Sequence, residues 1–108
     1  MAYTTRLQWE TLRVLDATTL SGAYQAIGTP TTHPAYLIKM VNTSDQTVTV
    51  SIDGASDVDV CPEGGFWLYD EYKTQYGESL PSGTQFFVKG SAATSGSIYL
   101  VVQYLQTN

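Results

Sequence analysis

The sequence predicts an all-β protein, a single antiparallel β-sandwich or jelly-roll-like domain of about eight short strands. Apolar and polar residues alternate with a period of two in short segments, most clearly in TVTVSI at Thr47–Ile52. Clusters of Gly, Pro, Asn and Asp separate these segments at fairly even spacing. No long stretch shows the 3.6-residue period of the crossover helices that a parallel sheet would need.

Four strands are expected in the first half of the chain: Thr11–Asp16, Ala23–Ile27, Ala35–Val41 and Thr47–Ile52. Between the second and the third, Pro30 and Pro34 remove backbone donors and fix φ, so a break is expected there. The third is a near-continuous apolar run, which indicates a strand that is buried on both faces or lies under a partner surface. The alternation in the fourth predicts an inward and an outward set. The inward set is Val48, Val50 and Ile52, and the outward set is Thr47, Thr49 and Ser51.

The second half begins with an expected tight hairpin at Asp53-Gly54, because this dipeptide favours turns with positive φ. Val58 and Val60 then alternate with two Asp residues in a short return strand with an acidic outer side. Three further strands are expected at Phe66–Tyr69, Gln85–Lys89 and Ser97–Leu105, and Asp70–Pro81 is expected to be a long loop or one helical turn.

Length and charge limit the possible partners. The 108 residues suffice for one domain, divided here into an N-terminal arm at 1–10 and a sandwich domain at 11–108. The net charge is −5 and the five basic residues are dispersed, so nucleic acid and anionic membranes are not expected as partners. No apolar run approaches the length of a membrane span or of a signal-peptide core. A single cysteine, Cys61, fits synthesis in a reducing cytoplasm.

The sequence shows no recognisable catalytic set or cofactor motif. His33 lies between Thr32 and Pro34 in an expected loop, without metal or triad partners at a recognisable spacing. No basic residue near Cys61 would lower the pKa of its thiol, so a small buried side chain is expected there. Asp70 or Glu71 could pair with Glu10 or Glu78 as glycosidase carboxylates, but any chain with ten carboxylates offers such pairs.

The acidic run after the hairpin is the most site-like cluster. It comprises Asp53, Asp57, Asp59 and Glu63. Carboxylates gathered by a hairpin could bind Ca²⁺, although their spacing differs from that of an EF-hand loop. A solvated strand face that also prevents edge-to-edge pairing is the preferred interpretation, with Asp53 serving the turn. No metal site is therefore predicted.

The aromatic content indicates an interaction surface. Two Trp and eight Tyr are many large amphipathic rings for a small core, and such rings are enriched in protein–protein contacts. The alternative is that they fill the core. The residues expected at an interface are Leu7, Trp9, Trp67, Tyr69, Tyr72, Tyr99 and Tyr104.

Two segments are expected to contribute to assembly. Met1–Glu10 has little strand pattern of its own, so we expect an arm ordered by docking on a neighbouring subunit, with Trp9 and Leu7 as anchors. The Tyr99–Leu105 segment is long enough to be an edge strand that augments a partner's sheet.

Seven ordered segments resemble those of small structural proteins of tailed bacteriophages. They are WETLR (9–13), YQAIGTP (24–30), IKMVN (38–42), VTVSIDG (48–54), PEGGFWLYD (62–70), LPSGTQFFVKG (80–90) and GSIYL (96–100). These segments are strand and turn landmarks, and none is a catalytic signature. Their order along nearly the whole chain carries the resemblance.

The resemblance implies a non-enzymatic virion protein that decorates or cements the capsid. Its partners would be other virion proteins, such as the major capsid or neck proteins, and copies of itself. It would be made in the host bacterial cytoplasm. One alternative is a neck or collar component at the head–tail junction. Another is a glycan-binding module of a tail appendage, which a single shallow groove with exposed Trp67 or Tyr72 would favour, whereas broad flat patches favour assembly.

Overall fold

The computed structural model describes residues 5–70 and 80–107, and their side chains from Gln8 to Asp70 and from Leu80 to Tyr104. These residues form nine strands and one short 3-10 helix. The elements are β1 (Thr5–Trp9), β2 (Arg13–Asp16), η1 (Ala17–Thr19), β3 (Gln25–Ala26), β4 (Ala35–Asn42), β5 (Val48–Ser51), β6 (Asp59–Cys61), β7 (Phe66–Asp70), β8 (Phe87–Lys89) and β9 (Ser97–Thr107). None of the helical structure in this part of the chain is long and apolar enough to span a membrane.

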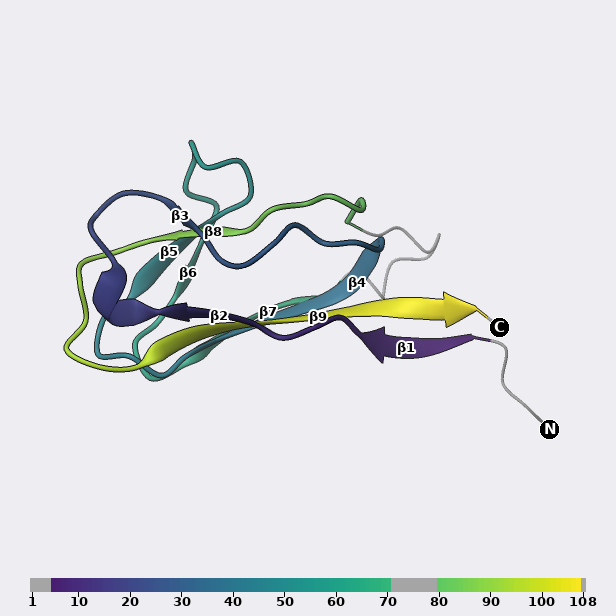
Figure 1. Ribbon diagram of the computed structural model, residues 1–108, viewed down its shortest axis with the longest axis horizontal. Helices are drawn as coiled ribbons and strands as arrows, with labels where there is room; N and C mark the ends of the chain where they lie inside the picture. Colours follow the sequence, from purple (N-terminus) through teal and green to yellow (C-terminus); the bar gives the residue numbers. More distant parts are fainter. Residues whose placement is uncertain (1–4, 71–79, 108) are drawn as a thin grey trace.

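The strands form two antiparallel sheets that pack face to face (Figure 1). Sheet A has the order β1-β9-β4-β7, and β2 pairs with β9 on the same side as β1. Sheet B has the order β3-β8-β5-β6. The predicted antiparallel sandwich is confirmed, with nine strands instead of about eight because residues 5–9 also form a strand.

Alternating side chains of both sheets build the core between them. Ile38 and Met40 of β4 lie opposite Val102 and Leu100 of β9, and all four side chains are buried. From sheet B, Val48, Val50 and Val88 face them. Phe86 is the largest fully buried side chain among the described residues. This is the pattern that period-2 alternation produces when one face of each sheet is removed from water.

One part of the predicted alternation is wrong. Val48 and Val50 are buried as expected, but Ser51 is buried and Ile52 is exposed. Ser51 Oγ accepts hydrogen bonds from the backbone N–H groups of Asp53 and Gly54 and donates to the Asp53 carboxylate at 2.9 Å. These hydrogen bonds hold the Ser51 side chain inside the turn, and the strand ends before Ile52.

The prediction that Tyr99–Leu105 forms a sheet edge is also wrong. β9 pairs with β4 on one side and with β1 and β2 on the other. From Ile98 to Tyr104, β9 is therefore an interior strand of sheet A. The chain's own N-terminal strands, β1 and β2, pair with the side of β9 that was expected to receive a strand of a partner.

The side chain of Asn42 organises the β4–β5 connection. The buried Asn42 side chain donates to the carbonyls of Gln46 and Cys61 and accepts from Ser44 N–H and Oγ. Gly96 packs against this turn with φ +103°, and a Cβ there would lie 2.6 Å from Ser44 Cα. Only glycine fits so close to the neighbouring backbone.

Candidate functional site

The outward side of sheet A is an apolar surface. Five of its side chains are at least half exposed: Trp9, Leu12, Val14, Phe66 and Leu68. Half-buried Leu37, Val41, Tyr99 and Val101 lie at the outward positions of the two central strands. We call these nine residues the outer face.

Strand register brings the outer face together from distant parts of the sequence. Val14 pairs with Tyr99, Tyr99 with Val41, and Val41 with Phe66. This row crosses the whole sheet, and the next row contains Val101, Lys39 and Leu68. Side chains opposite each other on paired strands lie about 5 Å apart, so the rows form one continuous surface.

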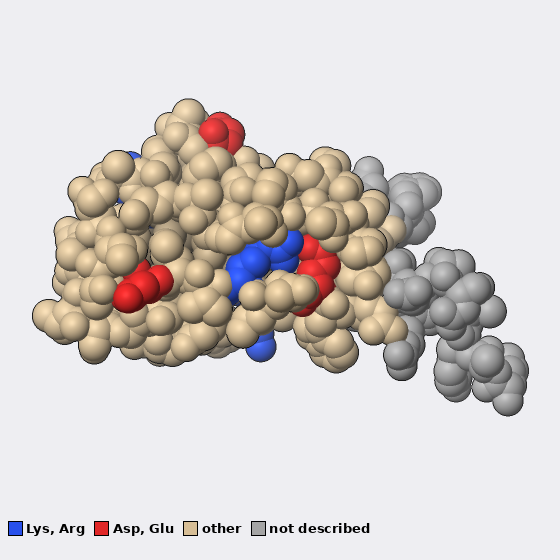
Figure 2. Space-filling view, in the orientation of Figure 1, with Lys and Arg blue, Asp and Glu red and all other residues tan. Residues whose placement is uncertain are grey.

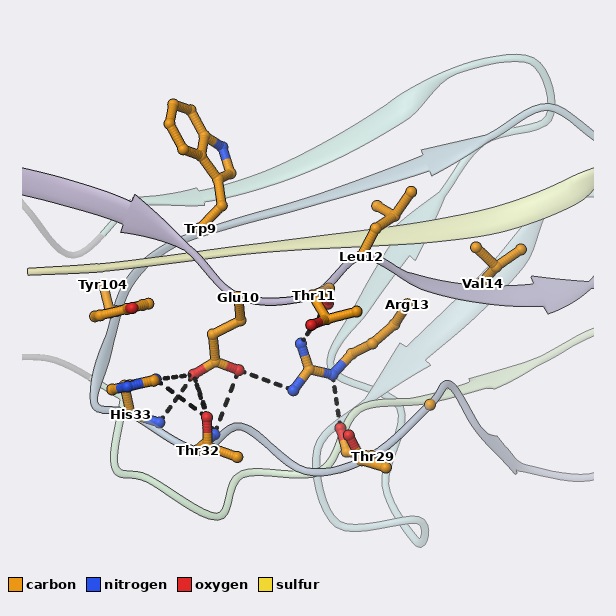
Figure 3. A pocket seen from close by; sticks show the side chains of 11 residues that line it. Trp9, Glu10, Thr11, Leu12, Arg13, Val14, Thr29, Thr32, His33 and Tyr104 are labelled. Carbon is orange, nitrogen blue, oxygen red and sulfur yellow. Dashed lines mark hydrogen bonds and ion pairs between the residues drawn. The ribbon is translucent and has the colours of Figure 1, made fainter.

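A bulge where β1 passes into β2 decides which side chains join this surface. Trp9 pairs with Gln103 and Arg13 pairs with Leu100, so this segment advances four residues while β9 advances three. In a regular strand, residues three apart point to opposite sides. The extra residue turns both Glu10 and Arg13 to the inner side, and Figure 3 shows them opposite Trp9, Leu12 and Val14.

Glu10 and Arg13, whose side chains are buried, are the centre of a polar cluster that also includes the exposed Thr32 and the partly exposed His33. The Arg13 guanidinium donates to Glu10 Oε1 at 2.8 Å and to the carbonyls of Thr11, Thr29 and Pro30. The second Glu10 oxygen accepts from the backbone N–H of Thr32 and from His33 N–H and Nδ1. The side chain of Glu10 is only 3% exposed. We call Glu10, Arg13, Thr32 and His33 the Glu10 cluster.

Hydrogen bonding keeps Glu10 ionised despite its burial. Burial opposes ionisation, but hydrogen bonds from His33, Arg13 and Thr32 outweigh it and lower the pKa of the carboxyl below its usual value. Both oxygens are occupied by partners from the protein itself. The carboxylate therefore fastens the start of sheet A to the loop before β4.

A groove of about 520 Å³ runs over this cluster between β1, β2 and the loop at 28–33. His33 stacks on Tyr104 with ring centroids 3.7 Å apart at one end of the groove. In Figure 2 this side of the molecule is largely uncharged, with a basic and an acidic group next to each other near its middle. The expected loop position of His33 is confirmed, and its ring supports Glu10.

A second hollow, of about 210 Å³, opens between the sheets beside β6 and β7. Trp67 lines it, half-buried, and packs edge-on against Phe86 while its indole N–H donates to Asp59. Trp67 therefore lines the hollow as a half-buried side chain that Phe86 and Asp59 hold in place. Tyr72, the other predicted sugar-binding residue, lies outside the described residues.

The acidic hairpin residues have separate partners. Asp53 accepts from the backbone N–H groups of Ala55 and Ser56, as expected for a turn residue. Asp57 accepts from Tyr24 and from Lys89, and Asp59 accepts from Trp67. Within residues 5–70 and 80–107, the His, Cys, Asp and Glu side chains form no group of three that could hold a metal ion.

Cys61 is a small core residue, as predicted. Its side chain is buried and contacts the carbonyl of Met40. Burial raises the pKa of the thiol to about 11, and the Asp59 charge adds to this effect. The thiolate needed for nucleophilic chemistry is therefore not populated near neutral pH.

The predicted interface residues divide into three groups. Trp9 and Tyr99 lie on the outer face. Trp67 and Tyr69 pack against the core, and Tyr104 is half-buried against His33. The side chains of Leu7 and Tyr72 lie outside the described residues. Thr5–Trp9 pairs with β9 of the same chain, while docking of an arm at 1–10 on a neighbour stays a prediction.

Leu12, Val14, Phe66 and Leu68 are outer-face residues that the sequence analysis did not name as interface residues. A signal for the last two was present, because FWLY is apolar at both alternating sets of positions. No such signal existed for the Glu10 cluster, since the bulge that aligns Glu10 with Arg13 has no sequence motif of its own.

Comparisons of the chain with models of protein families, with curated proteins and with solved structures give no match. The functional argument therefore depends on the geometry above.

Proposed function

We propose that this protein is a non-enzymatic structural protein of a bacteriophage virion, which decorates or cements the capsid through protein–protein contacts. The single observation that best supports this is the outer face. Trp9 and Phe66 are 64% and 63% exposed, at opposite edges of one apolar surface. A large exposed apolar patch of this kind is often a functional contact surface.

The polar chemistry of the described residues favours a structural role over an enzymatic one. Glu10, His33 and Arg13 hold one another and the neighbouring loop, and Cys61 is buried. An active site needs groups directed at a substrate position, with at least one nucleophile or base available. Neither the groove nor the hollow beside β7 presents such a set.

A neck or collar component would use the same fold and the same outer face at a different place in the particle, so it remains the structural alternative. A glycan-binding module of a tail appendage has less support. That function would use a single shallow groove with an exposed aromatic ring. Trp67 is only half-exposed in its hollow, and Trp9, which borders the groove, also belongs to the broader outer face.

Quantitative mass spectrometry of purified virus particles tests the proposal. Particles of the phage that encodes this chain should contain it in many copies, in constant proportion to the major capsid protein, after density-gradient purification. Detection in infected cells but not in purified particles would contradict the proposal. A few copies per particle would favour the neck position over the capsid surface.

A further inference from the structure

We propose that the outer face of sheet A binds a second copy of this chain, so that two sheets stack face to face about a two-fold axis. This inference deepens the proposed function and rests on it, since it identifies the first partner of the same surface. Three observations support it: the apolar area, the sheet geometry and the distribution of charge.

The exposed apolar area approaches what a stable dimer needs. The five most exposed side chains of the outer face present on the order of 500 Å² of apolar surface, at the upper end for a monomer. The half-buried residues between them add to it. A standard interface buries about 800 Å² on each partner, so this single face supplies most of that area.

The geometry of the face matches a known way of packing. Sheets stack about 10 Å apart when rows of side chains from each interdigitate. The inner side of sheet A already packs on sheet B in this manner (Figure 1). Its outer side offers similar rows of Val, Leu and aromatic residues, which run across the sheet from β2 over β9 and β4 to β7. A two-fold arrangement needs only one such patch, because both copies contribute the same surface.

Charge separates this face from the rest of the molecule. The chain carries a net charge of −5, so two copies repel each other through most approaches. Five acidic residues lie in sheet B or in the turns that lead into and out of it: Asp45, Asp53, Asp57, Asp59 and Glu63. Stacking through the outer face places these acidic regions at the two far sides of the dimer, where they are well solvated.

Lys39 lies within the outer face, between Val101 and Leu68. Its four-carbon stem can lie along the neighbouring apolar side chains while the ammonium group reaches the rim. Asp70, at the end of the same strand pair, adds a negative charge at one margin of the face. Asp16, two residues after Val14 at the end of β2, adds another negative charge at a second margin, so one Lys and two Asp leave this part of the surface with little net charge.

Sedimentation velocity on the purified full-length chain tests this inference with a matched pair of variants. Val14 and Val60 are each 50% exposed in strands, but Val14 lies on the outer face and Val60 on sheet B. The wild type should sediment as a dimer at micromolar concentrations. Val14→Asp should raise the dissociation constant at least about tenfold, because each two-fold contact then buries two unpaired charges. Val60→Asp should leave the dimer unchanged.

Circular dichroism and thermal unfolding establish that each variant is folded. If Val14→Asp fails to fold, Leu68→Asp on β7 provides an independent test of the same face. A wild type that stays monomeric up to about 100 µM would overturn the inference. So would equal effects of Val14→Asp and Val60→Asp, or a dimer that neither variant disturbs.

This result and the particle composition are independent measurements. A monomeric chain that is nevertheless present in particles would overturn the self-association alone, and the outer face would then contact another virion protein. A dimeric chain that is absent from particles would overturn the proposed function instead.

Discussion

At the residue scale, Glu10 stabilises the fold through a buried charge that is paired with Arg13. Glu10→Gln keeps the shape of the side chain but leaves the Arg13 guanidinium, 7% exposed, without a counter-ion. Breaking such a pair costs about 3 kcal/mol. We therefore expect a clear fall in the free energy of unfolding, measured by urea denaturation at pH 7. A loss below about 0.5 kcal/mol would mean that the cluster is solvated and does not fasten the loop.

The same carboxylate gives the fold a pH dependence of known sign. The pKa of Glu10 is lower in the folded protein than in the unfolded chain, so its contribution is complete above about pH 4.3 and is lost as the pH falls through the folded pKa. The stability difference between wild type and Glu10→Gln should shrink as the pH is lowered from 6 to about 3. A difference that stays constant over this range would show that the pKa of Glu10 is the same in the folded and the unfolded chain, so that the fold does not favour its ionised form.

Position 28 requires glycine because it lies directly against the Arg13 side chain. It has φ +67°, and a Cβ there would lie 2.6 Å from Arg13 Cγ. Gly22 has φ +85° with nothing within 4 Å of its Cβ position. Alanine at either position meets the left-handed backbone cost of about 1 kcal/mol, so Gly28→Ala should lose at least about 1 kcal/mol more than Gly22→Ala in urea unfolding. Equal losses would contradict the packing of Arg13 over Gly28.

At the element scale, β1 shows where sequence patterns stop being informative. Residues 5–9 become a strand because β9 offers them an edge, with Thr5 opposite Thr107 and Trp9 opposite Gln103. Their own sequence has no clear alternation. By contrast, β5 was predictable because sheet B buries one of its sides, and this burial imposes a period of two on the sequence. β4 and β9 were predictable from their apolar runs, although β4 is fully buried on one side only.

The Glu10 cluster could not be predicted for a related reason. Glu10 and Arg13 are three residues apart, a spacing that in a regular strand would separate them. A one-residue bulge reverses this, and only the register against β9 reveals it. Likewise, alternation could identify which side chains of β7 share a side, but not that the Phe66 and Leu68 side is left uncovered.

Removing β1 tests its role as a separable element. Deletion of residues 1–9 keeps Glu10 and β2, so we expect a folded chain whose melting temperature falls by several degrees and whose assembly is lost. Thermal unfolding followed by circular dichroism measures the first effect and sedimentation the second. The full-length Trp9→Ser variant separates the loss of the ring from the loss of the strand. An unfolded truncation would contradict the prediction of a separable arm.

At the scale of the whole molecule, the two sheets present different surfaces. Sheet B and its turns carry most of the acidic side chains among the described residues, and sheet A presents the apolar outer face. In the proposed role, the acidic side of such a molecule stays in water and the apolar side contacts protein. This asymmetry connects the fold with the proposed role in a particle.

Cryo-electron microscopy of the intact particle tests this account most directly, because it locates every copy and both of its surfaces. We expect paired copies on the capsid, or at the head–tail junction in the alternative, with Trp9, Val14 and Phe66 covered by the same residues of a second copy. A reconstruction without this chain, or one in which the outer face of every copy is open to solvent, would contradict the account.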